Sequence, residues 1–168
     1  MTQITRKIVL CGHFGVGKTS LINQFIHARF SEKYITTIGV TMEKKTVTID
    51  SDEEVTFIIW DLAGESETVK MNPAYLKGSH GAIYVFDVSR PETFQTLSEN
   101  VNKVMELIGR SVPLQVVGNK KDLLKNEEEE LEVLHMANHH VDALTSAKTG
   151  EEVENVFMNL AKAMLQIA

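Results

Sequence analysis

The sequence predicts a doubly wound α/β fold, with a mostly parallel sheet and one antiparallel strand at an edge. Short apolar runs alternate with longer amphipathic segments nearly throughout the 168 residues, as in repeated strand–helix units. Several of the apolar runs contain no polar residue, which is typical of strands that helices cover on both faces. One pair of strands is joined by a short turn instead of a helix, so these two strands must run antiparallel.

The first half of the chain is expected to form a strand, a helix and a hairpin. The run RKIVLC is apolar enough for a buried strand, and the next segment places Leu21, Ile22, Phe25 and Ile26 on one helical face. Polar turn residues at 50–53 separate two runs with strand composition. The predicted elements are a strand at 6–11, a helix at 17–27, and hairpin strands at 38–50 and 54–61.

The second half alternates between buried strands and helices. The run GAIYVFD is apolar until its last residue, Pro91 suits the first turn of a helix, and PLQVVGN is another apolar run. Glu127 to Glu130 lie at the start of an amphipathic segment, where the helix dipole favours negative charge. The predicted elements are strands at 81–87, 113–119 and 141–144, and helices at 91–109, 127–138 and 150–167.

Length and composition indicate one globular domain over residues 1–168. With 43% apolar and 24% charged residues, the chain is long enough to bury a full core. The net charge of −6 argues against nucleic-acid binding and against a standing attraction to anionic membranes. No run is long enough to span a bilayer, and no cysteine near the last residue offers a prenylation site, so no lipid anchor is visible in this chain; a chain from which a lipidated tail had been removed would look the same. Cys11 is the single cysteine, which excludes an internal disulfide and favours a cytoplasmic location.

The segment GHFGVGKTS follows the first strand and opens the first helix, and it matches the phosphate-binding pattern G-x-x-x-x-G-K-[ST]. Its backbone N–H groups can surround phosphate oxygens, and the helix adds the positive end of its dipole. Lys18 can reach the terminal phosphates, and the Thr19 hydroxyl can bind Mg²⁺. The loop residues expected to contact the nucleotide are Gly12, His13, Phe14, Gly15, Val16, Gly17, Lys18, Thr19 and Ser20.

Two further segments select guanine. NKKD follows one buried strand and TSAK follows the next, so both lie at the same edge of the sheet. The Asp122 carboxylate can accept from the N1–H and N2 amine of guanine, a donor pair that adenine lacks. Asn119 can brace the site, the Lys120 stem can cover one face of the base, and the Ala147 amide can bond the guanine O6. Ser146 and Lys148 complete the expected base site.

The segment DLAG, residues 61–64, has the form D-x-x-G at the tip of an apolar strand. Asp61 can hold a Mg²⁺-bound water beside the phosphate loop, and the Gly64 amide can reach the γ-phosphate. Thr37 can give the metal a second hydroxyl. The predicted metal site therefore consists of Thr19, Thr37 and, through water, Asp61.

On these motifs, the chain resembles the Ras-superfamily small GTPases over essentially its whole length, and it is most similar to the Rab branch. TIGV at 37–40, Trp60, Tyr75 and GSHGAIYVFDVS at 78–89 are Rab-like. The resemblance implies a six-stranded sheet with five helices and two switch segments, at about 32–40 and 63–77. It assigns Phe30 to the guanine and Tyr34 to the phosphates. It also implies Mg²⁺, GTP and GDP as ligands, and effector, exchange-factor and GAP proteins as partners.

The chain departs from the family pattern at four places. Phe14 replaces a small residue near the γ-phosphate, and Glu65 replaces the glutamine that orients the attacking water. Residues 66–68 lack the usual base and aromatic, and Met42 replaces a phenylalanine. We expect Lys18, Gly64 and Glu65 to act in a slow hydrolysis of GTP to GDP and phosphate. Phe14 is expected to obstruct an arginine from a GAP.

Two other functions stay open at this point. The chain could be a docking module of the same fold that holds GTP without useful hydrolysis, which Phe14 and Glu65 favour. It could also be a phosphate-loop enzyme for another nucleotide, such as a small-molecule kinase, although Asp122 and the SAK segment argue against this. Three histidines at 135, 139 and 140 are interpreted as surface or helix-end residues, not metal ligands.

Overall fold

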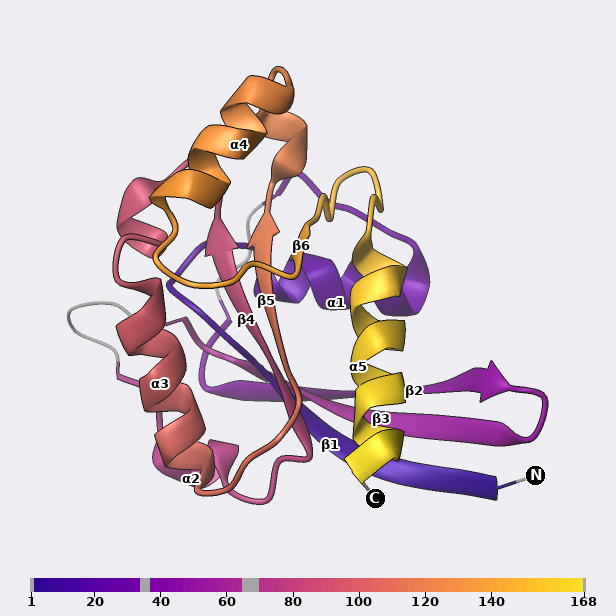
Figure 1. The fold of residues 1–168 in the computed structure, drawn as a ribbon. Coiled ribbons are helices and arrows are strands. Elements are labelled where there is room, and N and C mark those ends of the chain that lie inside the picture. Colours follow the sequence, from indigo (N-terminus) through magenta and orange to yellow (C-terminus); the bar gives the residue numbers. More distant parts are fainter. Residues whose placement is uncertain (1, 34–36, 65–69, 168) are drawn as a thin grey trace.

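The computed structural model describes residues 2–33, 37–64 and 70–167 of the chain (Figure 1). The strands in these residues are β1 (Thr2–Cys11), β2 (Val40–Asp50), β3 (Glu53–Leu62), β4 (Gly81–Asp87), β5 (Leu114–Asn119) and β6 (Ala143–Leu144). The helices are α1 (Lys18–His27), α2 (Pro73–Leu76), α3 (Leu97–Ile108), α4 (Glu127–Met136) and α5 (Val153–Ile167). Two 3₁₀ turns, η1 (Pro91–Thr93) and η2 (Lys121–Leu123), follow β4 and β5.

The six strands form one mixed sheet in the order β2-β3-β1-β4-β5-β6. Only the β2–β3 pair is antiparallel, and β2 is an edge strand. β1 pairs in parallel with both β3 and β4, and the other pairs are also parallel. This sheet and its five helices confirm the predicted fold class.

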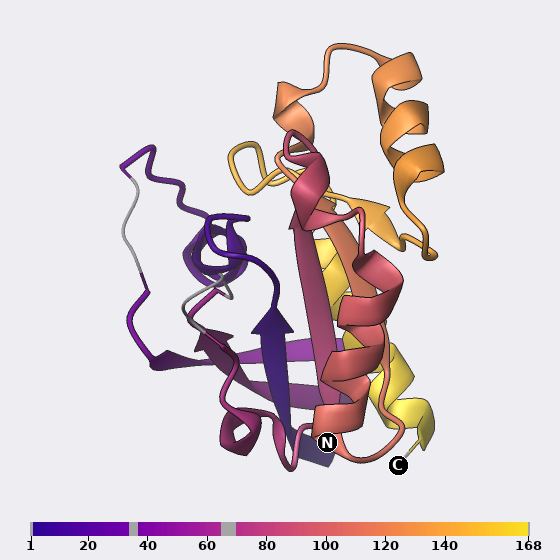
Figure 2. The ribbon, with the colours of Figure 1, turned by 90° about the vertical axis from the view of Figure 1, so that its left-hand side faces the viewer.

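Helices cover both faces of the sheet, as the fully apolar strands require (Figure 2). One core cluster joins the sheet to α1 and α5, and a second joins it to α2, α3 and α4. Alternate residues of β1 serve the two clusters, with Ile8 in the first and Val9 in the second. In the first cluster the rings of Phe25 and Phe157 stack with centroids 3.9 Å apart, and this stack fixes α1 against α5.

The predicted helix at 91–109 is wrong in its first third. The chain forms the turn η1, breaks at Phe94, and begins α3 only at Leu97. The cause is the buried side chain of Thr93, whose hydroxyl donates to the Arg90 and Asp87 carbonyls and accepts from the Asp87 amide. These bonds tie the segment to the end of β4, and a continuous helix from Pro91 would break them.

Among the other boundaries that differ from the prediction, those of β6 and α5 have a local reason. β6 is limited to two residues because the Asp142 carboxylate accepts from the Val116 amide at 2.7 Å, where a ladder bond would otherwise form. α5 begins at Val153 because Gly150 and Glu152 have positive φ. The short helix α2 was predicted from family resemblance alone, although Asn72 followed by Pro73 is a helix-start signal.

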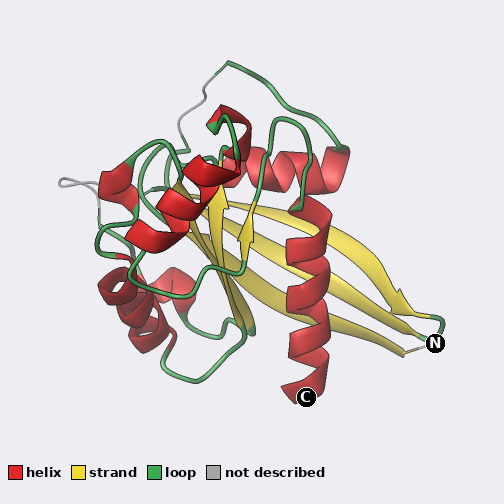
Figure 3. Cartoon of the chain, turned by 45° about the horizontal axis from the view of Figure 1, so that its top comes forward, coloured by secondary structure: helices red, strands yellow, loops and turns green. Residues whose placement is uncertain are grey.

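The carboxyl ends of the parallel strands meet at one end of the molecule, together with the loops that follow them (Figure 3). The phosphate loop leaves β1 there, the NKKD segment leaves β5, and the TSAK segment leaves β6. Of the helices in the described residues, none has the length and apolar content that crossing a bilayer would require.

Candidate functional site

A pocket of about 430 Å³ opens between these loops. Its walls come from the phosphate loop, the start of α1, the segment after α1, the end of β3, and the NKKD and SAK segments. The predicted residues that line it are Phe14, Gly15, Gly17, Lys18, Thr19, Ser20, Phe30, Thr37, Gly64, Asn119, Lys120, Asp122, Ala147 and Lys148. The tertiary structure therefore gathers segments that are far apart in the sequence around one cavity.

The phosphate loop has the backbone that its glycines allow. Gly17 has φ +100°, and a Cβ on it would lie 2.3 Å from the Asn119 side-chain nitrogen, so only glycine fits this position. No side chain of the described residues caps the first turn of α1. Lys18 is 6% exposed, and its ammonium donates to the carbonyls of Gly12 and His13 at 3.1 Å each. These bonds hold a positive charge inside the loop, where phosphate oxygens would lie.

Three side-chain oxygens meet at the wall of the pocket, which Thr19 and Thr37 line. The Thr19 hydroxyl donates to Asp61 Oδ2 at 2.6 Å and lies 2.7 Å from the Thr37 hydroxyl. Asp61 is 2% exposed, and its Oδ1 has no hydrogen-bond partner among the described residues. A buried, unsatisfied carboxylate oxygen is costly unless a ligand or water completes it.

The electrostatics of this cluster suit a divalent cation. Burial raises the pKa of Asp61 above its ordinary value, although the hydrogen bond from Thr19 and the charge of Lys18 act in the opposite direction. Oxygen ligands from hydroxyls and a carboxylate, with phosphate oxygens nearby, are what Mg²⁺ prefers. Thr19, Thr37 and Asp61 therefore fit the predicted metal.

Asn119 connects the base-side loops. It is 1% exposed, its amide nitrogen donates to the Val16 carbonyl at 3.0 Å, and its oxygen accepts from the Thr145 hydroxyl at 3.1 Å. The same oxygen accepts from the Ala147 amide at 3.2 Å, the N–H group that was predicted for guanine O6. Asn119 thus braces three loops, while the assignment of the Ala147 amide to O6 stays a prediction.

Asp122 and Lys120 both belong to the NKKD segment, and both line the pocket. The Ser146 hydroxyl donates to Asp122 Oδ1 at 2.7 Å, which fixes the orientation of the carboxylate. The Lys120 ammonium donates to the Gly15 carbonyl at 2.9 Å and lies 2.8 Å from Asp87 Oδ2. The Lys120 stem therefore crosses from the NKKD segment to the phosphate loop, as a cover for a base would.

Gly64 lies directly against the phosphate loop. A Cβ at this position would be 2.4 Å from Phe14 Cα and 2.6 Å from Phe14 N, both backbone atoms that cannot rotate away. Phe14 itself is 43% exposed and lines the pocket, and Arg90 donates to its carbonyl at 2.8 Å. Glycine at position 64 is therefore required by close packing, in addition to any role of its amide.

The remaining predicted residues divide into three groups. Gly12, His13, Val16 and Ser146 support the loops without lining the pocket. Phe30 is 40% exposed at the pocket rim, and Lys148 pairs with Glu32 at 3.2 Å across that rim. Tyr34 and Glu65 lie outside the described residues, as do residues 66–68 of the second switch segment.

Two contributing residues were missed by sequence reasoning. Asp87 is fully buried, accepts from the Ser89 amide and hydroxyl, and holds Lys120. An acid at the end of the apolar run GAIYVFD, at the same sheet edge as Asn119, was a usable signal. Arg90 gave no such signal, because only the folded chain brings its guanidinium to Phe14.

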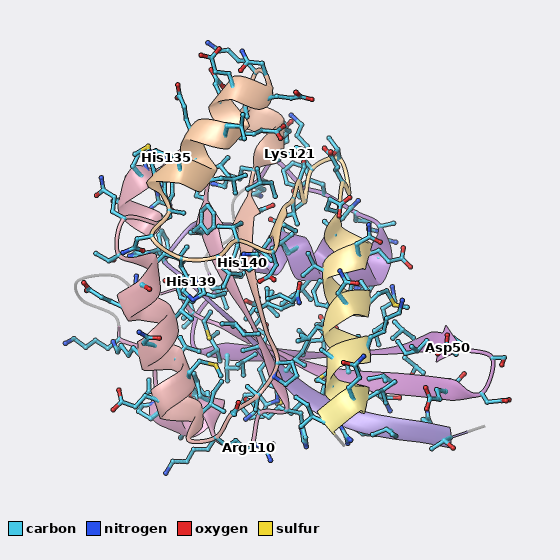
Figure 4. All side chains as sticks on the ribbon, in the orientation of Figure 1. Asp50, Arg110, Lys121, His135, His139 and His140 are labelled. Carbon is cyan, nitrogen blue, oxygen red and sulfur yellow. The ribbon has the colours of Figure 1, made fainter. Side chains whose placement is uncertain are left out.

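The surface features that were predicted from sequence lie away from the pocket. Figure 4 shows His135 on α4 and His139 and His140 on the loop that follows it. No group of three possible metal ligands of the His, Cys, Asp or Glu type occurs among the described residues.

Trp60 contacts Tyr75 with ring centroids 6.0 Å apart, and Met42, its β2 pairing partner, is 60% exposed.

Comparisons with known proteins agree with this geometry. Residues 7–166 match the model of the Ras family. Ras-related protein Rab-21 of Mus musculus is 34% identical over 165 residues, which cover 96% of this chain and 74% of the relative. Ras-related protein Rab-5B of Plasmodium falciparum is 34% identical over 156 residues, which cover 92% of this chain and 75% of the relative. Ras-related protein RABF2a of Arabidopsis thaliana is 33% identical over 168 residues, which cover 98% of this chain and 84% of the relative.

Proposed function

The chain belongs to the Ras family of small GTPases, and on this premise we propose that it is a guanine-nucleotide switch. Residues 1–168 would act as one GTP-binding domain that binds GTP or GDP with Mg²⁺ and hydrolyses GTP slowly. Residues about 32–40 and 63–77 would change conformation with the γ-phosphate and thereby control effector binding. Exchange-factor and GAP proteins would set the balance between the two states.

The observation that carries this proposal is the convergence of Lys18, Asp122 and Lys120 on one pocket. Lys18 places a charge where the β- and γ-phosphates would bind. Asp122, oriented by Ser146, faces the same cavity as an acceptor for the donor pair of guanine. A site whose acceptor pairs with both N1–H and the N2 amine favours guanine over a base that lacks this donor pair, because two hydrogen bonds to a carboxylate are lost with the other base.

The metal and the chain would share the stabilisation of phosphate charge. Mg²⁺, when bound, supplies positive charge at the β- and γ-phosphate oxygens. Thr19 and Thr37 would hold it directly, and Asp61 would hold it through water. Lys18 and the loop amides add fixed positive potential that needs no reorganisation during the reaction.

Glu65 would orient the attacking water. The water oxygen bonds to the γ-phosphorus, the bond from the β–γ bridging oxygen to the γ-phosphorus breaks, and the water proton passes to the released phosphate. A carboxylate accepts from this water more strongly than an amide, but it cannot donate to the γ-phosphate unless it is protonated. Two unit charges about 4 Å apart also repel by about 1 kcal/mol in water and several-fold more where water is excluded. Mg²⁺, Lys18 and the loop amides would offset part of this repulsion, so the favourable orientation of the water and the unfavourable charge nearly balance. We therefore expect hydrolysis that is slow but real, since about 1.4 kcal/mol changes a rate tenfold.

A second function, a GTP-bound docking module with impaired hydrolysis, is favoured by Phe14. Phe14 is 43% exposed at the phosphate loop, and its backbone is packed against Gly64. An arginine that arrives from a partner would have to pass this ring. The two functions differ in the intrinsic rate of hydrolysis, which does not depend on a partner.

The test has two parts, on the full chain with Mg²⁺. First, nucleotide affinity is measured for the protein and for Asp122→Asn, with Asp52→Asn in the exposed hairpin turn as a control of equal charge. Asp122→Asn should weaken GTP binding and strengthen binding of xanthosine triphosphate, whose C2 oxygen accepts where guanine donates. Unchanged GTP affinity would refute the base site.

Second, single-turnover phosphate release is measured for the protein and for Glu65→Ala. If Glu65 orients the water, the variant should release phosphate several-fold more slowly with nearly unchanged GTP affinity. Equal rates would show that Glu65 is not catalytic. No release from the unaltered protein would favour the docking module.

A further inference from the structure

A second cavity, of about 180 Å³, lies at the opposite end of the sheet from the nucleotide pocket. Figure 4 shows this separation through two labelled residues, because Lys121 lies beside the nucleotide loops and Arg110 lies at the other end. The basic residues that line the cavity are Arg6, His80 and Arg110, and the apolar ones include Val112, Met164 and Ile167. The cavity thus combines three basic side chains with an apolar wall.

The three basic side chains come from separate elements and meet only in the fold. Arg6 belongs to β1, His80 precedes β4, and Arg110 lies in the loop between α3 and β5. Within the described residues, none of the three forms an ion pair with a carboxylate, and no acidic residue lines the cavity. In a chain with 23 acidic residues and a net charge of −6, this is a local positive site in a negative protein.

The donors of this site are held in place. Arg110 donates from Nε and Nη2 to the Ser79 carbonyl at 3.2 and 2.8 Å, which fixes the guanidinium and leaves three of its five N–H groups outside these bonds. His80 Nδ1 accepts from the Lys7 amide at 3.0 Å, so in the neutral ring the proton is on Nε2, which remains a donor. In the part of the chain that the structure describes, the one hydrogen bond of the Arg6 guanidinium goes to the carbonyl of its neighbour Thr5, at 3.2 Å.

The potential inside the cavity is reflected in His80. Burial lowers the pKa of His80, and the positive charges of Arg6, Arg110 and Lys7 lower it further. No acidic group is among the causes of this shift. The direction of this shift agrees with the basic lining of the cavity, which would favour an anion.

We propose that this cavity binds a phosphoryl oxyanion, with Arg6 and Arg110 as charged donors and His80 Nε2 as a third donor. Arginine forks match phosphate geometry, and charge-assisted bonds of this kind are among the strongest that side chains make. At about 30 Å³ per water, the cavity holds the volume of about six waters, so it can admit a phosphoryl group but not a drug-sized molecule. The carrier of the group would lie along the apolar wall, and it could be a small phosphorylated molecule or a phospholipid headgroup.

His80 offers a local probe for the test, because phosphate at the distant nucleotide pocket would not contact it. The ring signals of His80 are followed by NMR during titration of the full chain with inorganic phosphate at constant ionic strength, with chloride as the reference salt. Phosphate should shift them in a saturable manner and raise the pKa of His80. A response to phosphate no larger than that to chloride would overturn the proposal.

Variants assign the response to the cavity. Arg110→Gln should weaken phosphate binding about tenfold or more, the value of one charge-assisted hydrogen bond. Arg6→Gln should act in the same direction, and it tests the proposal independently if Arg110→Gln fails to fold. Lys162→Gln removes the same charge from an exposed position on α5 that does not line the cavity. Equal weakening by all three variants would mean that only net charge matters, and would also overturn the proposal.

Flotation with vesicles separates the two sources of the phosphoryl group. Vesicles of phosphatidylcholine with phosphatidic acid, a phosphomonoester, are compared with vesicles containing phosphatidylglycerol, a diester. Binding to the first alone, lost in Arg110→Gln, supports a lipid headgroup. A His80 response to phosphate without vesicle binding supports a small phosphorylated molecule. If His80 does not respond to phosphate and the protein does not bind the vesicles, the site is refuted.

Discussion

Replacing Gly64 with alanine tests whether the close packing of the second switch segment against the phosphate loop is needed for GTP binding. The added Cβ would lie 2.4 Å from Phe14 Cα, which is about 1 Å below ordinary van der Waals contact, and 2.6 Å from Phe14 N. Both neighbours are backbone atoms, so no side-chain rotation relieves the overlap. The segment after β3 must therefore move away from the phosphate loop by about the same distance.

The displacement should affect GTP more than GDP. If the Gly64 amide donates to the γ-phosphate, a shift of about 1 Å takes this bond beyond hydrogen-bond range. Hydrogen bonds to charged groups are worth about 1.5–3 kcal/mol, which corresponds to a loss of GTP affinity of about 10- to 150-fold. GDP has no γ-phosphate, so its affinity should stay nearly constant.

The assay measures dissociation constants for GTP and GDP, in the presence of Mg²⁺, from association and dissociation rates of fluorescent analogues. Gly109→Ala is the matched control, because it adds the same methyl group in open space at the end of α3, far from the pocket. Its φ of +81° costs about 1–2 kcal/mol of stability but should leave the GTP to GDP affinity ratio unchanged. The reasoning is refuted if Gly64→Ala leaves that ratio unchanged or weakens both nucleotides equally.

Three further outcomes follow from the described contacts. Asp87→Asn removes the charge that holds Lys120 at 2.8 Å. The free energy of unfolding, measured by chemical denaturation, should fall by about 1–3 kcal/mol, and nucleotide release should become faster. Release at the parent rate would contradict this role. Phe157→Ala removes the ring of a residue that is 1% exposed, and the free energy of unfolding should fall by about 3–5 kcal/mol. A decrease below about 1 kcal/mol would mean that the core collapses around the gap. Because the pKa of His80 is lower in the folded than in the unfolded chain, the imidazole of the unfolded chain is protonated first as pH falls. Stability should therefore decrease below pH 6.5 until the ring of the folded chain is also protonated. His80→Asn should remove that slope, and an identical pH profile would contradict the assigned shift.

Local chemistry determined much of this protein. Apolar runs without polar interruption specify strands that are covered on both faces, and the glycines and lysine of GHFGVGKTS specify a phosphate loop wherever a strand feeds a helix. Because parallel strands end at one edge of the sheet, the sequence order also predicted that NKKD and TSAK would meet this loop. Glu65 and Tyr34 lie outside the described residues, so their assigned roles stay predictions.

Long-range contacts were decided only by the tertiary structure. The parallel register of β4 and β5 places Asp87 opposite Asn119, and this pairing brings the buried acid to Lys120. Thr93 bonds to the end of β4 and thereby breaks a segment that has the composition of a continuous helix.

The second cavity depends on the fold in the same way. Arg6, His80 and Arg110 carry no signal as a group in the sequence, and they form a basic site only because β1, β4 and the α3–β5 loop start or turn at the same end of the sheet. Propensity and pattern act over a few residues, whereas strand register and helix packing set which distant side chains meet. For this reason the sequence could identify the nucleotide loops, while the partners of Lys120, the close packing at Gly64 and the basic cavity required the folded chain.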